Sequence, residues 1–152
     1  MSSDVIRIAE SQVGFREDPK GSNRGVDIDK YTGARAEPWC AHFVAWVFRE
    51  AGKPIPGDVI PNKKRANPLA SVSHTERVFA EHGWLVREPG PGDVVFFKTR
   101  GQSDRGPGRH IGIVVGVDLT HIDVVDGNWG DRVSKRRIRR NDPEIVNYGR
   151  RP

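Results

Sequence analysis

Apolar residues recur at helical spacing in the first half of the chain. One set follows a candidate cap at Ser3 and ends at Gly14; it comprises Val5, Ile6, Ile8, Ala9 and Val13. A second helix is expected from about 38 to 51, because Pro38 suits the first turn of a helix and Gly52 suits the left-handed residue after one. Apolar groups surround most of this second helix, which is typical of a helix buried in a core.

Loops and one further helix are expected around these two helices. Residues 15–38 are rich in Gly, Asp, Asn and Lys without periodicity, which predicts a long loop with one short helical turn at 27–31. Long loops in compact domains often carry function. Ser73-His74-Thr75-Glu76 has the form of a capping box, so a helix is expected to begin there and to end at Gly83.

The hydrophobic period changes from 3.6 to 2 after Gly90-Pro91-Gly92-Asp93. The segments then expected to be strands are 94–97, 111–117, 121–125, 133–138 and 145–148. Helices followed by an antiparallel sheet predict an α+β fold. Because the chain has 152 residues, no internal repeat and no linker-like tract, we expect one domain over residues 1–152.

Composition excludes several classes of protein. Hydrophobic residues make up 36% of the chain and charged residues 30%, which is the balance of a globular protein. No stretch approaches the roughly 20 apolar residues that a membrane-spanning helix needs. The first four residues, Met1-Ser2-Ser3-Asp4, lack the basic and then apolar layout of a secretory signal. We therefore expect a protein made in the cytoplasm and not stably inserted in a membrane.

Cys40 is the single cysteine, so the chain forms no internal disulfide and no structural zinc site with several thiolates. A thiol attacks as the thiolate, and the N-terminus of a helix stabilises negative charge through its free N–H groups and its dipole. Cys40 falls in the first turn of the helix expected at 38–51, so it is a candidate nucleophile. An unreactive core cysteine is the common alternative, and the position of Cys40 alone leaves it open.

Five histidines are candidates for the base that such a nucleophile needs. His42 lies two positions from Cys40 on the same expected helix, so its side chain should point away from the thiol. His110 opens the strand expected at 111–117 and follows Gly106-Pro107-Gly108 closely. A side chain at the mouth of a strand, beside glycines, can face a substrate cleft, so His110 is the preferred base.

A hairpin between the strands at 111–117 and 121–125 would bring two candidate partners to His110. A turn near position 118 places residue 110 opposite Asp126, and a turn near 119 places it opposite Asn128. In both registers the two side chains share a face with His110, within reach of direct or diagonal cross-strand contact. Such a group fixes the orientation of the imidazole and stabilises its charged form. Asp126-Gly127-Asn128 also fits an ordinary turn, and the pattern alone does not decide between the two interpretations.

Taken together, these motifs resemble the CHAP family, the cysteine, histidine-dependent amidohydrolases/peptidases related to NlpC/P60 and more distantly to papain. The motifs are Pro38-Trp39-Cys40-Ala41-His42-Phe43-Val44, Pro91-Gly92-Asp93-Val94-Val95, His110-Ile111-Gly112-Ile113-Val114 and Asp126-Gly127-Asn128-Trp129. The resemblance covers nearly the whole chain and implies N-terminal helices packed on a papain-like antiparallel sheet. It also implies Cys40 as nucleophile, His110 as base, and Asp126 or Asn128 as the orienting group. Trp39 and Trp129, beside these residues, are expected to bind substrate.

The resemblance implies a peptidoglycan hydrolase that cuts an amide bond through a cysteine thioester. The bond would be the one between N-acetylmuramic acid and L-alanine, or one within the stem or cross-bridge peptide. Some related domains hold calcium in the N-terminal loop, but Asp27 and Asp29 are too few for the 6 to 8 oxygen ligands that calcium takes, so no metal or other cofactor is expected.

Small single-domain proteins of this kind come from phages and bacteria, so a bacteriolytic role such as that of an endolysin is expected. Without a signal peptide, the protein would act on the cell wall after delivery during phage lysis, on a virion, or by a secretion system. We expect a monomer whose partners are peptidoglycan and, for delivery or protection of the host, a delivery partner or an immunity protein.

A net charge of +5 and a pI near 9.7 keep a second class of function open, a module that binds nucleic acid or an anionic surface. The basic residues near the C-terminus are Arg132, Lys135, Arg136, Arg137, Arg139 and Arg140. On a strand such charges usually form a solvated face or protect a sheet edge, and no nucleic-acid-binding motif accompanies them, so we expect no nucleic acid partner. Two more hypotheses are a metal-dependent hydrolase with Cys40, His110 and Asp126 as ligands, and an enzyme that cuts protein or small-peptide amides.

Overall fold

The computed structural model describes residues 2–99 and 109–152. The helices are α1 (Ser2–Ser11), α2 (Asp29–Thr32), α3 (Cys40–Glu50), the 3-10 helix η1 (Pro68–Ala70) and α4 (Val72–Glu81). The strands are β1 (Leu85–Val86), β2 (Val94–Phe97), β3 (His110–Val117), β4 (His121–Asp126), β5 (Ser134–Arg139) and β6 (Ile145–Gly149). Helices precede an antiparallel sheet, which confirms the α+β prediction. The glycine-rich segment 106–108 lies outside the described residues.

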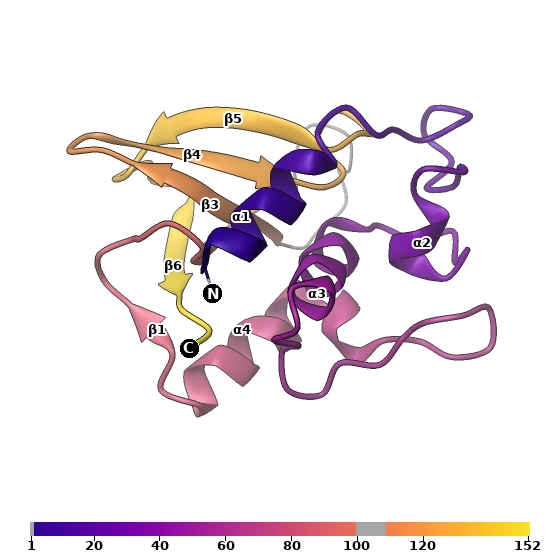
Figure 1. Cartoon of the computed structure of the whole chain (residues 1–152), viewed down its shortest axis with the longest axis horizontal. Coiled ribbons are helices and arrows are strands. Elements are labelled where there is room, and N and C mark those ends of the chain that lie inside the picture. The colour runs from indigo at the N-terminus through magenta and orange to yellow at the C-terminus, as the bar shows by residue number, and fades with distance from the viewer. Residues whose placement is uncertain (1, 100–108) are drawn as a thin grey trace.

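The strands form one sheet in the order β1-β6-β2-β3-β4-β5, and each neighbouring pair is antiparallel. Helices α1 and α3 contact each other and both contact β3, so they cover the same part of the sheet (Figure 1). Helix α2 packs on α3, and η1 bridges α3 and α4. This arrangement brings the beginning of α3 close to the strands β3 and β4.

Side chains of the strands alternate between two apolar clusters, as the period of 2 requires. In β2, Val94 and Phe96 pack against the helices, whereas Val95 and Phe97 join a smaller cluster formed within the sheet. Most residues of α3 are buried, so the prediction of a core helix is confirmed. A buried helix surrounded by close packing is a rigid support for whatever its first residue does.

Some sequence-based boundaries were wrong. The expected capping box at Ser73 does not form, because Ser71, directly after η1, is the N-cap instead. Ser71 is in extended conformation, and its hydroxyl accepts a hydrogen bond from the His74 N–H at 3.2 Å. Helix α4 therefore begins before Ser73, and Glu76 pairs with Arg109 instead. Strand β1 was missed because it has two residues, too few for any period to be visible.

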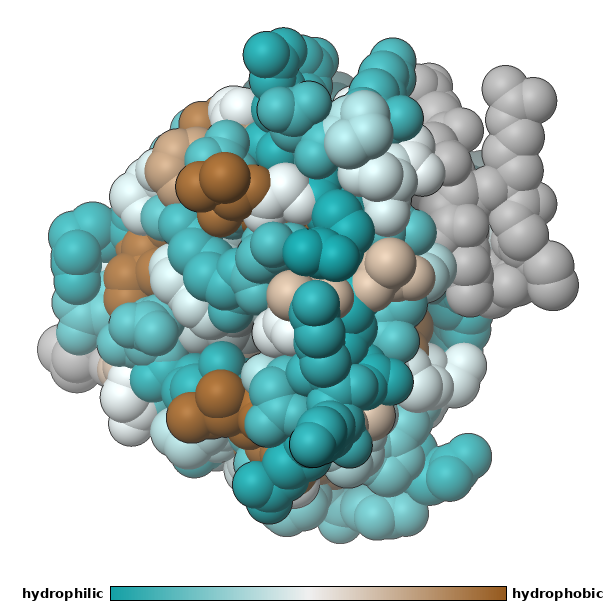
Figure 2. All heavy atoms as spheres, turned by 90° about the vertical axis from the view of Figure 1, so that its right-hand side faces the viewer, coloured by the Kyte–Doolittle hydropathy of each residue, from teal (hydrophilic) through white to brown (hydrophobic). Residues whose placement is uncertain are grey.

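The surface shows scattered hydrophobic residues. On the face in Figure 2, which looks onto the right-hand side of Figure 1, small hydrophobic groups are separated by hydrophilic ones. The exposed large hydrophobic residues are Val13, Val26, Ile60, Leu119 and Val146. Scattered single residues of this kind are normal on a folded protein. Among the helices of the described residues, none is both long and apolar enough to span a bilayer.

Candidate active site

Cys40 is the first residue of α3 and lines a cleft. Its side chain is buried with a residual exposure of 7%, and the thiol is free. The cleft has a volume of about 200 Å³ and is lined by Pro38, Cys40, Ala70, Ser71, Val72, Ser73 and Arg109. The long loop expected at 15–38 thus contributes its last residue to the wall. A sulfur that borders a cleft fits a nucleophile better than it fits a sealed core residue.

The start of α3 has free hydrogen-bonding capacity beside this sulfur. The N-cap residue is Trp39, and its side chain makes no capping hydrogen bond to the first amides of the helix. The first N–H groups of a helix have no partner within the helix, and they carry part of its positive dipole. These amides are therefore placed to stabilise a thiolate, and an oxyanion formed next to it.

His110 joins Cys40 to Asp126. It is the first residue of β3 and is almost fully buried. Its Nε2 lies 2.8 Å from the Asp126 Oδ2. Cys40 lies near enough to the ring to raise the pKa of His110. Because Nε2 is engaged by the carboxylate, Nδ1 is the ring atom left for the sulfur. The structure thus brings together three of the residues predicted from the sequence.

The environment of His110 favours its charged form. Burial alone lowers the pKa of the ring, because a charge is poorly solvated in the interior. The hydrogen bonds and negative charges of Asp126 and Cys40 outweigh that effect and raise the pKa of His110 from 6.5 to about 9. At neutral pH the ring is therefore an imidazolium, which can stabilise a thiolate and donate a proton to a departing amine.

The hairpin register explains why Asp126 contacts His110. Ile113 pairs with Val125, and continuing this register by one residue places Gly112 opposite Asp126. It also places His110 opposite Asn128, which is the register expected for a turn near 119. Because Gly112 has no side chain, Asp126 has room to lean diagonally onto His110. A Cβ at Gly112 would lie 2.5 Å from a methyl of Val124 and 3.2 Å from the Cβ of Asp126.

Gly112→Ala is therefore expected to destabilise the protein by about 1–3 kcal/mol, since a methyl group must be forced into packed space, and to lower activity by displacing Asp126. Gly116→Ala on the same strand is a matched control. The three atoms nearest to its Cβ would all belong to the side chain of Asp123, which is partly exposed. Urea denaturation measures the difference in stability. Equal stability and activity of the two variants would contradict this role of Gly112.

Asn128 is close to the triad in sequence but makes different contacts. It is buried, its backbone is left-handed with φ 58°, and its Oδ1 has no hydrogen-bond partner among the described residues. Gly127 before it packs tightly on α3, because a Cβ there would lie 2.7 Å from that of Phe43. Of the two residues, Asp126 is therefore the one that makes a hydrogen bond to His110.

The two tryptophans differ in position. Trp39 has no exposed surface, stacks on Tyr31 and donates a hydrogen bond from Nε1 to Glu17 at 2.8 Å. Its expected contact with substrate is therefore corrected: Trp39 supports the site from within the core. Trp129 is half-buried, and its ring centroid lies 5.5 Å from that of His110. A contact of Trp129 with substrate stays a prediction.

The N-terminal loop is held by ion pairs and hydrogen bonds of its own. Asp29 pairs with Arg24 at 2.9 Å, and the backbone N–H of Arg16 contacts the carboxylate of Asp27 at 3.4 Å. With Asp29 engaged by Arg24, these two carboxylates fall well short of the 6 to 8 oxygen ligands that calcium takes. Within residues 2–99 and 109–152, no cluster of three or more His, Cys, Asp or Glu side chains is arranged to hold a metal.

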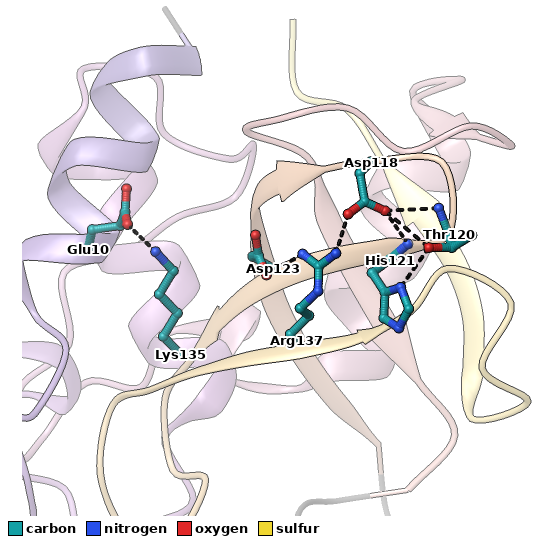
Figure 3. Close-up of polar contacts among 7 residues, drawn as sticks. All are labelled: Glu10, Asp118, Thr120, His121, Asp123, Lys135 and Arg137. Carbon is teal, nitrogen blue, oxygen red and sulfur yellow. Dashed lines mark hydrogen bonds and ion pairs between the residues drawn. The ribbon is translucent and has the colours of Figure 1, made fainter.

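Carboxylates neutralise much of the basic C-terminal segment. On the face of the sheet that α1 packs against, Lys135 pairs with Glu10 of α1 at 2.7 Å, and Arg137 pairs with Asp118 and Asp123 (Figure 3). Backbone hydrogen bonds from Thr120 and His121 and the Arg137 guanidinium hold the pKa of Asp118 below its ordinary value. Charges paired in this way attract a polyanion less than free ones do, which weakens the case for nucleic-acid binding.

Arg136, from the same basic segment, was not recognised as part of the site. Its guanidinium reaches the carboxylate of Asp126 from the neighbouring strand β5. The alternation of strand residues separates Arg136 from Lys135 and Arg137, but it does not show which face of the strand meets Asp126. Residues 134, 136 and 138 share one face of β5, and Asp126 pairs with Ser134 on that face.

Comparison with known proteins agrees with this geometry. The family model described as the CHAP domain matches residues 31–128. The crystal structure of Ly7917 superposes with a TM-score of 0.60 and 16% identity, covering 100% of this chain and 62% of that one. A second structure, Ly7917 with the hydrolyzing product of MDP, gives a TM-score of 0.58 and 15% identity over 97% of this chain and 61% of that one. This chain thus spans a little under two thirds of the length of these structures.

Proposed function

This chain belongs to the CHAP domain family, and we propose that it is a cysteine-dependent peptidoglycan hydrolase that cleaves an amide bond. The observation that carries the proposal is the His110–Asp126 hydrogen bond, with the Cys40 thiol beside this ring at the edge of a cleft. Peptidoglycan as the substrate class is supported by the fold shared with Ly7917, one structure of which holds a product of the hydrolysis of MDP, a muramyl dipeptide.

The proposed reaction is acyl transfer through a thioester. The Cys40 thiolate attacks the carbonyl carbon of the amide and forms a C–S bond, while the first amides of α3 face the developing oxyanion. His110 gives its proton to the nitrogen as the C–N bond breaks, and the amine leaves. Neutral His110 then takes a proton from water, the resulting hydroxide attacks the thioester, and the carboxylic acid product departs. The thiolate and the imidazolium are thereby restored.

Asp126 has a separate task in this scheme. Its carboxylate accepts the hydrogen bond from Nε2 of His110, which turns Nδ1 toward the sulfur and stabilises the positive ring. The bond that is cut is either the one between N-acetylmuramic acid and L-alanine or one within the stem or cross-bridge peptide. The walls of the cleft, built by Pro38 and by residues 70–73, select between these bonds through their fit to the acyl group.

Digestion of purified sacculi followed by mass spectrometry of the released muropeptides tests this function. An amidase releases stem peptides with a free L-alanine amine, and an endopeptidase leaves the stem on the glycan and creates new termini within the peptide. We expect one of these product sets from the wild-type chain and neither from Cys40→Ala. Sacculi from several wall chemotypes that all remain intact with the folded wild-type protein would contradict the proposal.

A further inference from the structure

Two basic side chains bind the same buried carboxylate. Asp126 has no exposed surface, and its Oδ2 accepts hydrogen bonds from His110 Nε2 at 2.8 Å and from Arg136 Nε at 3.0 Å. Arg136 Nε also lies 3.3 Å from Oδ1, and its Nη2 bonds to Oδ2. A buried carboxylate with several charged donors is held in one orientation. The guanidinium therefore contributes to fixing the group that orients His110.

The position of Arg136 is itself constrained by its neighbours. Arg136 pairs with Val124 in the β4–β5 ladder, so it reaches Asp126 diagonally, as Asp126 reaches His110. Its guanidinium carbon lies 3.5 Å from the ring centroid of Trp129 and 5.5 Å from that of Phe97. Both rings also lie 5.5 Å from the His110 ring. Stacking between aromatic faces limits the freedom of an arginine and strengthens its ion pair by excluding water.

We propose that Arg136 is a positioning residue of the active site, which fixes the Asp126 carboxylate and shares its negative charge with His110. The inference rests on the proposed function, because it concerns the same reaction. Arg136 acts through Asp126 and touches no reacting atom. Its charge sets how firmly His110 holds the proton that the departing amine must receive.

Loss of Arg136 is expected to change two measurable quantities: it should stabilise the charged form of His110 and it should lower kcat. The titratable or charged groups in contact with Asp126 or His110 among the described residues are Cys40 of α3, His110 of β3, Asp126 of β4 and Arg136 of β5. Without Arg136, the carboxylate has His110 as its remaining charged partner, so the imidazolium is more stable. The carboxylate also loses its fixed orientation, so His110 aligns less well with the sulfur and turnover slows.

Arg136→Gln is therefore expected to lower kcat by about 10- to 100-fold with KM within about 3-fold of wild type, as is typical when the partner of an orienting group is removed. The basic limb of the profile of kcat/KM against pH should move upward by about half a unit or more. Arg136→Lys keeps the charge but not the forked geometry of the guanidinium. The basic limb of its pH profile should therefore stay near that of wild type, while its kcat should lie between those of wild type and Arg136→Gln.

Arg137→Gln is the matched control. Arg137 is the next residue on β5, but it points to the opposite face of the strand from Arg136, where its partners are Asp118 and Asp123 (Figure 3). This variant removes the same charge from the same strand and should keep the kcat and the pH profile of wild type. If Arg136→Gln had the same kcat and the same pH profile as Arg137→Gln, the inference would be overturned.

Two further measurements separate this inference from the proposed function and from a loss of fold. The rate of Cys40 alkylation by iodoacetamide, followed against pH, reports on the Cys40–His110 pair without any substrate. The pH at which this rate changes as His110 loses its proton should be higher in Arg136→Gln than in wild type, and unchanged in Arg137→Gln. In an Asp126→Asn background, Arg136→Gln should have little additional effect on kcat or on alkylation, because both changes act on one interaction. Full additivity would overturn the inference. If Arg136→Gln does not fold, Arg136→Lys decides, and a kcat equal to that of wild type would overturn it.

Discussion

Cys40→Ala is expected to abolish hydrolysis while leaving the protein folded. Removing the nucleophile of such an enzyme lowers kcat by about 10⁴- to 10⁶-fold, because the remaining groups only bind and polarise the substrate. The fold should tolerate the change, since the side chain loses a single sulfur at the edge of a cleft and the cost is about 1 kcal/mol. Release of soluble muropeptides from sacculi measures activity, and thermal unfolding monitored by circular dichroism measures the fold.

Cys40→Ser provides a second version of this experiment. It replaces the thiol with a hydroxyl of similar size at the same position, but an alkoxide is far harder to form beside His110 than a thiolate. We expect a folded protein with activity near that of Cys40→Ala. Turnover in either variant at a tenth of the wild-type rate or more would contradict the assignment of Cys40 as nucleophile.

His110→Gln is expected to reduce kcat by about 10³- to 10⁵-fold, because the departing amine loses its proton donor and the thiolate loses its counter-charge. His121→Gln is the matched control. His121 lies at the other end of the hairpin, where it contacts Thr120, and its loss should leave kcat unchanged (Figure 3). Steady-state kinetics on a purified muropeptide measures both variants. Similar rates for the two would contradict the role of His110.

The pH profile of the wild-type enzyme gives an independent check on His110. Its pKa is raised to about 9, so the ring carries its proton below that pH and loses it as the pH rises further. Activity that needs the imidazolium should therefore persist through neutral pH and fall as the pH passes about 9. A basic limb near 6.5, the ordinary value for histidine, would show that Asp126 and Cys40 do not act on the ring as the geometry indicates.

The sequence predicted the part of the site that depends on local chemistry. Pro38 and Gly52 predicted the two ends of one helix, and α3 begins at Cys40, two residues after the predicted start, so the thiol lies in its first turn as expected. The strand that starts with His110 was visible from its apolar run. These features follow from backbone preferences of single residues, so they need no knowledge of the rest of the fold.

Features that depend on packing between elements were harder to predict. The hairpin allowed two registers, and the structure has an irregularity between Val114 and Gly116, which a strict period of 2 does not show. Trp39 was expected at the substrate because it precedes Cys40, yet residue 39 at the N-cap turns inward onto Tyr31. Arg136 was grouped with its basic neighbours, since only the pairing of β5 with β4 reveals which arginine faces Asp126.

One measurement tests the central claim most directly, namely that the Cys40 sulfur forms the bond to the substrate. The chain contains a single cysteine, so the extent of carbamidomethylation by iodoacetamide, read from the intact mass, equals the fraction of Cys40 that is blocked. We predict that residual activity on sacculi falls in proportion to this fraction and reaches zero at one adduct per chain. A fully modified chain that still releases muropeptides at the wild-type rate would contradict the account.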